Sequence, residues 1–376
     1  MIKVILIGPL DPEVPEGDLK LLTGGETTYI RTLLQSPPNG IVYTHWSKAL
    51  KKREIEFTLI HHLVSILVKL RILPISSGSF CIRVAGDYDM IHAHSNSIKI
   101  IGRKIPIVLS DSSSNYLFLR DYLNWPQWRI NFGYFLRRKI FKILKIIDPD
   151  SNLEGAKKLI VFSEFAKKIH LKLGAAKTKV QVIHPGLSKM VVKRKKSIRG
   201  DVSILFVGTW FERKGGLIML EAFKRLSKNY KNIQLTVVGP IPEKFKLETA
   251  KFKVQSYDYV PRERLLKDFY PNADIFALVP PRVEGYGFVV LEAMAFGIPV
   301  VVSNICALAE LVDDGRTGFV VKPGSVDDLE RKLGILIKSK TVRNIMGKAA
   351  RRRFLENYLI QRSNEKLLEV YRQALS

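Results

Sequence analysis

Residues 275–302 constrain the fold of this 376-residue chain more tightly than any other stretch. An apolar run at 275–279 has the composition of a buried strand, and the two prolines that follow must end it. Gly285 and Gly287 then permit a tight turn, and apolar residues recur at helical spacing directly after them. A glycine and a proline end that helix before a second apolar strand at 298–302. The sequence therefore predicts a strand, a glycine-rich loop, a helix and a strand, which is the repeating unit of an α/β domain.

Two carboxylates in this unit, Glu284 and Glu292, lie where a phosphorylated ligand could use them. A helix start offers free N–H groups and a partial positive charge, which suit a phosphate. Glu292, about one turn further along the helix, could hold two ribose hydroxyls, and Glu284 could hold a sugar beyond the phosphates. Alternatively, both are ordinary glutamates at a helix end and on its surface. The loop and helix start would contribute backbone groups of Gly285, Tyr286, Gly287, Phe288 and Val289.

This segment resembles the donor-site signature of the retaining glycosyltransferases of family four, which have the GT-B fold. The resemblance is carried by Glu-Gly-Tyr-Gly-Phe at 284–288 and by Glu-Ala-Met-Ala-Phe-Gly-Ile-Pro-Val-Val at 292–301. It implies an α/β protein of two doubly wound, Rossmann-like domains facing an interdomain cleft. It also implies retaining transfer of a hexose-type sugar from a UDP- or GDP-sugar, with no metal and no other cofactor required.

The strand, loop and helix pattern restarts near residue 204, after a strongly basic segment at 186–200. We therefore expect an acceptor-side Rossmann-like domain at 1–188 and a nucleotide-sugar domain at 189–358. By the resemblance, a C-terminal helix at 359–376 packs back on the first domain.

The loop after the first strand of the second domain carries two cations that could contact a diphosphate. Lys214 precedes a glycine and a predicted helix start, so its ammonium can reach a phosphate, and Arg213 could add a bidentate contact. The family usually has Arg where this chain has Thr209; either Arg213 replaces it or the diphosphate is held less tightly. The alternative for both cations is surface charge. The resemblance assigns catalytic roles to Glu284, Lys214 and Arg213, and it adds to the donor-binding residues Gly24, Gly25, Gly208, Thr209, Tyr259 and Val260.

The predicted acceptor side of the first domain departs from the family. Ser110 and Asp111 stand where a His-Asp pair is usual, so Asp111 either serves the acceptor side or caps the next helix. His94 alternates with His92 on one face of a predicted strand, and the pair is either structural, cleft-lining or metal-binding. Residues 148–150 match the D-x-D metal motif of another glycosyltransferase fold class, but we interpret them as a turn and cap.

The formal net charge of +26 predicts an anionic partner. The sequence has no zinc or recognition-helix pattern that would favour nucleic acid. A basic amphipathic helix at 129–147 would either lie on an anionic membrane or pack as a core helix with a solvated basic back. Its expected apolar stripe consists of Phe132, Leu136, Ile140, Ile143 and Ile147.

These observations predict a cytoplasmic enzyme, peripheral on the inner face of the cell membrane, that acts on a glycan or lipid-linked acceptor. The two cysteines are far apart in sequence and indicate a reducing compartment. Neither a secretory signal nor a membrane span is expected. Two alternatives stay open: a transferase of the same fold with a soluble acceptor, and an inactive GT-B scaffold subunit. The departures at Ser110 and Thr209 are the features that keep the inactive-scaffold alternative open.

Overall fold

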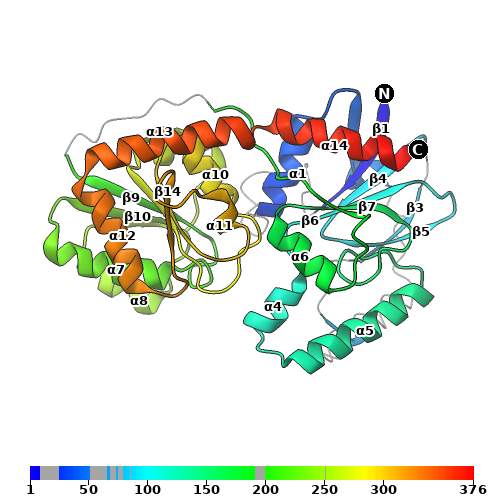
Figure 1. The fold of residues 1–376 in the computed structure, drawn as a ribbon, viewed down its shortest axis with the longest axis horizontal. Helices are drawn as coiled ribbons and strands as arrows, with labels where there is room; N and C mark the ends of the chain where they lie inside the picture. Colours follow the sequence, from blue (N-terminus) through cyan, green and yellow to red (C-terminus); the bar gives the residue numbers. More distant parts are fainter. Residues whose placement is uncertain are drawn as a thin grey trace. The chain divides into compact units, whose positions relative to one another are not determined.

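The computed structural model of the chain describes residues 1–8, 25–50, 66–67, 73–74, 79–84, 86–190, 200–249 and 251–376. The chain divides into two compact units (Figure 1). Unit 1 consists of Met1–Gly186 and Ile360–Ser376, and unit 2 consists of Leu187–Leu359. The division falls inside the basic segment expected at 186–200, of which residues 191–199 lie outside the described part.

Unit 1 is built on a six-stranded sheet in the order β2-β1-β4-β6-β7-β8. All neighbouring strands pair in parallel. The strands are β1 (Ile2–Ile7), β2 (Ile41–His45), β4 (Met90–His94), β6 (Ile107–Asp111), β7 (Ala156–Val161) and β8 (Val180–Val182). β4 and β6 are buried along their whole length, as expected of parallel strands covered on both faces. A separate parallel pair is formed by β3 (Ser79–Arg83) and β5 (Ser97–Ile101).

The helices of unit 1 include the last one of the chain. They are α1 (Gly25–Gln35), α2 (Trp46–Ala49), α4 (Asn115–Asp121), α5 (Gln127–Ile143), α6 (Glu164–Lys172) and α14 (Ile360–Leu375). α14 contacts β6 and β7, and its Tyr371 hydroxyl lies 2.8 Å from the hydroxyl of Tyr43. The return of the C-terminal helix to the first half, implied by the resemblance, is therefore present.

Unit 2 repeats the plan with a parallel sheet in the order β11-β10-β9-β12-β13-β14. Its strands are β9 (Val202–Val207), β10 (Ile233–Val238), β11 (Val254–Tyr257), β12 (Ile275–Leu278), β13 (Val300–Ser303) and β14 (Gly318–Val321). The helical segments are α7 (Gly216–Asn229), α8 (Glu243–Thr249), α9 (Arg262–Arg264), η3 (Leu265–Phe269), η4 (Tyr270–Asn272), α10 (Phe288–Ala295), α11 (Leu308–Leu311), α12 (Val326–Lys338) and α13 (Lys340–Asn357). The predicted strand, loop, helix and strand at 275–302 are β12, α10 and β13.

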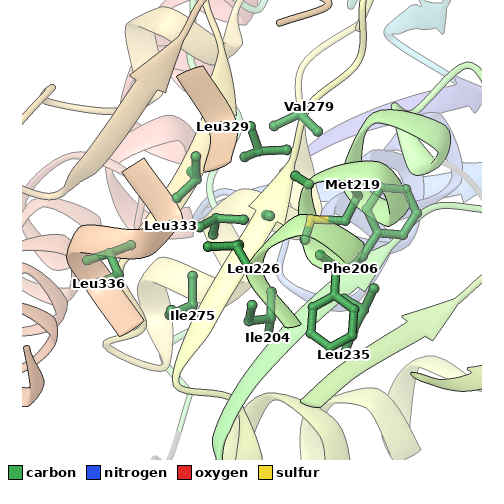
Figure 2. Packing of buried hydrophobic residues seen from close by; sticks show 14 of the residues in the cluster. Ile204, Phe206, Met219, Leu226, Leu235, Ile275, Val279, Leu329, Leu333 and Leu336 are labelled. Atoms are coloured by element: carbon green, nitrogen blue, oxygen red, sulfur yellow. The ribbon is translucent and has the colours of Figure 1, made fainter. Parts of the chain in front are cut away.

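The core of unit 2 joins two helices to the sheet (Figure 2). Met219 and Leu226 of α7 and Leu333 of α12 pack over Ile204 and Ile275 of the two central strands. All five side chains are buried, and this packing fixes the strand ends from which the site loops begin.

Helix α5 differs from the prediction in its bounds and in the face that it buries. It covers Gln127–Ile143, where 129–147 was expected. Two residues of the expected apolar stripe, Phe132 and Ile143, are exposed, whereas Arg137 is buried. Arg137 pairs with the buried Asp148, and this distant partner rotates the packed face of the helix away from the stripe. Within the described residues, no helix is long and apolar enough to cross a membrane.

Candidate functional site

In unit 2, the loops after β9 and β12 leave the carboxyl edge of the sheet at the point where the strand order reverses. β9 and β12 are neighbours, while β10 and β13 continue the sheet in opposite directions. Loops that diverge at such a switch point leave a crevice, and this is where α/β sheets bind ligands. The two loops carry Lys214 and Glu284, the residues on which the donor-site prediction depends.

Lys214 and Glu284 are in contact, because the β9 loop packs directly on the end of β12. Gly215 has a φ of +88°, and a Cβ there would lie 2.0 Å from the carbonyl oxygen of Val279. Only glycine allows this approach. It brings the Nζ of Lys214 onto Oε2 of Glu284 in a short ion pair. The ammonium and the carboxylate therefore lie together at the switch point, where a ligand with phosphate and hydroxyl groups could contact both.

Lys214 is paired with Glu284 and shielded from water. Burial lowers the pKa of Lys214, the negative charge of Glu284 raises it, and Arg213 lowers it further; the net direction is downward. The pair is nearly enclosed, since Glu284 is buried and the Lys214 side chain is only 15% exposed. In such surroundings, a second anion near the ammonium would be held more strongly than at a surface.

Helix α10 begins beside this pair, and no side chain of its N-cap residue caps it. Its N-cap is Gly287, which has a φ of +93° and makes no side-chain cap bond. A Cβ at this position would lie 2.5 Å from Leu308, so glycine is needed here too. The N–H groups of Phe288 and Val289 precede the first intrahelical bond, which Val290 donates to Gly287. A phosphate could accept hydrogen bonds from both.

Glu292, in the second turn of α10, is buried and held by two donors. Arg262 donates from Nε to Oε1 at 2.8 Å, and the hydroxyl of Tyr270 donates to Oε2 at 2.8 Å. Burial raises the pKa of Tyr270 well above its ordinary value, and the charge of Glu292 adds to this, so the phenol remains a donor. The two contacts fix the carboxylate plane, as a pair of ribose hydroxyls would need.

The other predicted donor residues of unit 2 follow the carboxyl ends of β9, β11 and β12. Thr209 and Tyr259 are half-buried, and Val260 is buried. Tyr286 is also buried, with its ring against that of Phe288 at 5.3 Å. Gly208 is at the end of β9, and Gly285 is half-buried in the β12 loop. Arg213 lies over the exposed ring of Trp210, with its guanidinium 5.3 Å from the ring centre.

In unit 1, the predicted acceptor-side residues His94 and Ser110 belong to a buried polar chain. Ser110 Oγ lies 3.0 Å from His94 Nδ1 and 2.8 Å from His92 Nε2. The other ring nitrogen of His92 contacts the hydroxyl of Tyr371. Burial lowers the pKa of each histidine to about 3, so both are neutral at physiological pH. Of the two glycines predicted on this side, Gly25 is the first residue of α1, and Gly24 lies outside the described residues.

Asp111 neither caps a helix nor faces Ser110. The cap of α4 is Ser114, which accepts a hydrogen bond from Tyr116 N. Asp111 is buried, accepts a hydrogen bond from Ser95 and lies 3.1 Å from Nε2 of the buried His170. The capping alternative for Asp111 is therefore wrong, and its partner His170 comes from α6.

Asp150, from the predicted turn, joins Asp111 and His170 in a compact buried group. Their ligand atoms lie within 4.8 Å of one another, the separation that a metal ion requires. The imidazole is already used, however: Nε2 faces Asp111, and Nδ1 is 3.2 Å from Pro149 O and 3.9 Å from Asp150. Burial opposes protonation of His170, but the hydrogen bond and charge of Asp111 raise its pKa above the ordinary value. The group is an imidazole held between two carboxyl groups.

Asp148 makes the predicted turn, but it does more than cap it. Its Oδ2 accepts from the N–H of Ser151 at 2.7 Å, and Oδ1 accepts from Ser97 at 2.7 Å and from Arg137. Asp148 and Arg137 are both buried, so the turn locks α5 to β5 through a fully desolvated ion pair. His92 and His94 do not take part in this cluster or in the Asp111 group, the candidate metal-ligand group among the described residues.

Two residues that touch the donor-site carboxylate, Arg262 and Tyr270, were missed by sequence reasoning. They lie 30 and 22 residues before Glu292, so no local spacing connects them to it. The sequence does indicate that Glu292 must have partners, although it does not say which. A carboxylate on a helix as apolar as α10 must be buried, and a buried carboxylate needs hydrogen-bond donors.

Residues 191–353, almost the whole of unit 2, match the family model described as "Glycosyl transferases group 1". Unit 2 is therefore similar in sequence to this family. An uncharacterized glycosyltransferase of Haemophilus influenzae is 26% identical over 58% of the chain and 60% of its own length. The capsular polysaccharide biosynthesis glycosyltransferase CapM of Staphylococcus aureus is 28% identical over 49% of each chain. The match thus spans about half to three fifths of the length of these curated relatives.

The fold is also that of solved two-domain glycosyltransferase structures. The crystal structure of Anabaena HepE in complex with UDP and glucose superposes with a TM-score of 0.62 at 13% identity. The superposition covers 99% of this chain and 100% of HepE. The two parallel-sheet, Rossmann-like units and this likeness confirm the predicted GT-B class.

Proposed function

We propose that the chain is a retaining glycosyltransferase that moves a hexose-type sugar from a nucleotide-sugar donor to an acceptor hydroxyl. One observation carries the proposal: at the switch point of unit 2, the Lys214–Glu284 pair and the uncapped start of α10 adjoin a carboxylate, Glu292, that is already oriented by two donors. These are the groups that a sugar, a diphosphate and a ribose would use in turn. The match of unit 2 to the family model and the glycosyltransferase names of the relatives support this proposal.

In the proposed complex, the diphosphate lies at the α10 start, where the N–H groups of Phe288 and Val289 donate to it. Lys214 adds a positive charge, and the neighbouring Arg213 adds a second. Because these groups can neutralise the departing diphosphate, the proposed reaction needs no metal or other cofactor. Glu292 accepts hydrogen bonds from the ribose hydroxyls, and Glu284 accepts from hydroxyls of the donor sugar.

The transfer breaks the bond between the sugar C1 and the diphosphate oxygen and forms a bond between C1 and the acceptor oxygen. The acceptor proton goes to the leaving diphosphate oxygen, and the new bond forms on the same face of the sugar. Lys214 and the α10 start act most strongly on the charge that develops as the diphosphate departs. UDP is the first nucleotide to test, because HepE was crystallised with UDP and glucose; GDP is the second.

For the acceptor, we propose a glycan or lipid-linked glycan reached from the cytoplasmic face of the membrane. The net charge of +26 favours an anionic surface, and residues 122–147 contain no Asp or Glu. Neither Cys81 nor Cys306 forms a disulfide, which fits a reducing compartment. CapM is named for capsular polysaccharide biosynthesis, and this supports a glycan acceptor.

Donor binding is tested by thermal shift with UDP, GDP, ADP, dTDP and their common sugar conjugates, on the wild type and on Glu292→Ala. A ligand present at a hundred times its dissociation constant stabilises the folded state by about 2.7 kcal/mol. We expect one nucleotide to raise Tm in the wild type and not in Glu292→Ala. A panel without any shift, together with no sugar transfer from any donor, would contradict the proposal and support an inactive scaffold subunit.

A further inference from the structure

We infer that the outer face of α5 is a docking surface for an anionic phospholipid bilayer. The inference rests on the membrane-side acceptor proposed above and names the surface that would bring the enzyme there. Figure 1 shows α5 along the rim of unit 1, next to α4. Its inner side is fastened by Ile130, Tyr134 and Phe141, which are all buried.

Large apolar side chains form a single stripe along the opposite side of this helix. Trp128 is 69% exposed, Phe132 and Phe135 are each 58% exposed, and Ile143 is 78% exposed. At 3.6 residues per turn, these four positions fall within about 80° of arc. Three of the four exposed Trp and Phe side chains in the described part of the chain lie here, and the fourth is Trp210 of unit 2. Single exposed apolar residues are ordinary, but several large ones gathered along one side of a helix mark an interaction surface.

The charges around the stripe are of one sign. Residues 122–147 hold six cations and no carboxylate. Arg137 is one of the six, but it forms a buried ion pair with Asp148 and does not contribute to the exposed charge. The exposed lysines of the segment are Lys139, Lys142 and Lys145.

The groups that face these cations leave most of the positive charge available. Lys139 falls within the same arc as the four apolar positions and lies 5.7 Å from the centre of the Phe135 ring, so that a cation stands within the stripe. Lys142 makes an exposed pair with Glu154 at 2.8 Å, and such a pair is worth little in water. Arg138 donates to the backbone oxygens of Ser151 and Leu173, which carry no formal charge.

This combination fits a bilayer surface better than a protein surface. Aromatic rings favour the headgroup level of a membrane, and each nearby Lys or Arg adds attraction to anionic lipid. The apolar stripe is bordered by cations on a helix whose other face is packed, so the helix would lie in the interface plane and not span it. A second copy of the chain would bring an equally basic face to the contact, and the repulsion between the two faces disfavours that occupant.

The test is flotation of the full chain with vesicles of phosphatidylcholine and phosphatidylglycerol, against vesicles of phosphatidylcholine alone. We expect binding to the anionic vesicles only, and loss of most of it when salt is raised from about 50 to 500 mM. Phe132→Ser/Phe135→Ser should lower the partition coefficient by about tenfold or more, because both rings leave the interface. The matched control is Ile335→Ser/Ile345→Ser, which removes two exposed apolar side chains from unit 2 and should bind as the wild type does.

Equal binding of the wild type and the Phe132/Phe135 variant would overturn the inference, as would equal binding to both vesicle types. A dimer in sedimentation equilibrium that the Phe132/Phe135 variant abolishes would also overturn it, in favour of a second copy of the chain. Nucleotide binding is measured separately by thermal shift without vesicles. A protein that binds UDP but no vesicles would contradict the docking surface and leave the proposed glycosyl transfer unaffected. The converse result would remove the donor site alone.

Discussion

The two units carry polar clusters of similar composition that are used in opposite ways. In unit 1, the buried charges pair with each other inside the fold, Arg137 with Asp148 and His170 with Asp111. In unit 2, Glu292 is also buried, but its cluster adjoins the uncapped start of α10 at the switch point. The difference teaches that buried charge alone does not mark a site. A site also needs hydrogen-bonding groups beside the charge that a ligand can reach.

The largest expected effect is on stability and comes from breaking the unit 1 cluster. Arg137→Met leaves the Asp148 carboxylate buried without its cation, and the free energy of unfolding of unit 1 should fall by about 3 to 5 kcal/mol. Chemical denaturation measures this fall. Arg137→Met/Asp148→Asn removes both charges and should recover part of the loss. If the single variant were as stable as the wild type, the pair would not be a structural lock.

The matching change in unit 2 should affect transfer and leave folding intact. Lys214→Ala removes the cation beside the departing diphosphate, and kcat/KM should fall by about 100- to 1000-fold, as expected for one lost electrostatic contact to developing charge. Lys224→Ala, an exposed lysine of α7, is the control and should keep full activity. An activity loss in Lys214→Ala that is explained by unfolding would erase the contrast between the units.

A smaller effect is expected at Arg262, which holds Glu292 without a predicted ligand contact of its own. Arg262→Met should weaken nucleotide binding by about three- to tenfold, because the carboxylate keeps Tyr270 but loses its charged partner. Arg264→Met on the same helix is the control, because Arg264 is exposed and faces Asp268. Calorimetric titration with the nucleotide measures both. Equal affinity in Arg262→Met and the wild type would show that Tyr270 suffices to orient Glu292.

Much of the proposed donor site could be predicted, because the residues that indicate it lie close together in the sequence. Two prolines and two glycines between β12 and α10 give the loop, and the Gly-Ile-Pro segment ends the helix within the same thirty residues. α10 then begins at Phe288 as expected. Lys214 was predicted by its place before a glycine at a helix start, although its partner Glu284 lies 70 residues away.

What could not be predicted depends on contacts between distant segments. The apolar periodicity of α5 indicates an amphipathic helix but not which side packs. The buried Arg137–Asp148 pair determines the side that faces the core. The capping alternative for Asp111 was wrong, and its partner His170, on a helix 59 residues further along, was not foreseen. Tyr371 meets His92 across 279 residues. Sequence spacing contains no information on such pairs.

A further expected effect is a pH dependence that belongs to unit 1. The pKa of Asp150 is raised from 3.8 to about 6, chiefly by burial and then by the charge of Asp111. Folding therefore favours the protonated acid, so its stabilisation is complete below pH 3.8 and is lost as pH rises through 6. The pKa of His170 is raised as well, so its contribution is also lost with rising pH.

Asp150→Asn removes the titrating acid. Relative to this variant, the wild type should lose about 1 to 3 kcal/mol of stability between pH 4 and 7. Denaturation curves at a series of pH values measure the difference, and Asp121→Asn serves as the control on an exposed ion pair. A constant difference across the range would mean that Asp150 is ionised throughout. The same series should leave nucleotide binding in unit 2 unaffected by the Asp150 change.

The most direct measurement is a crystal structure of the full chain with UDP bound. We expect the ribose hydroxyls within about 2.6–3.2 Å of the Glu292 carboxylate, and the diphosphate at the N–H groups of Phe288 and Val289. Lys214 Nζ should have moved from Glu284 towards a phosphate oxygen. A nucleotide bound with its ribose away from Glu292, or with its diphosphate away from the start of α10, would contradict the donor site described for unit 2.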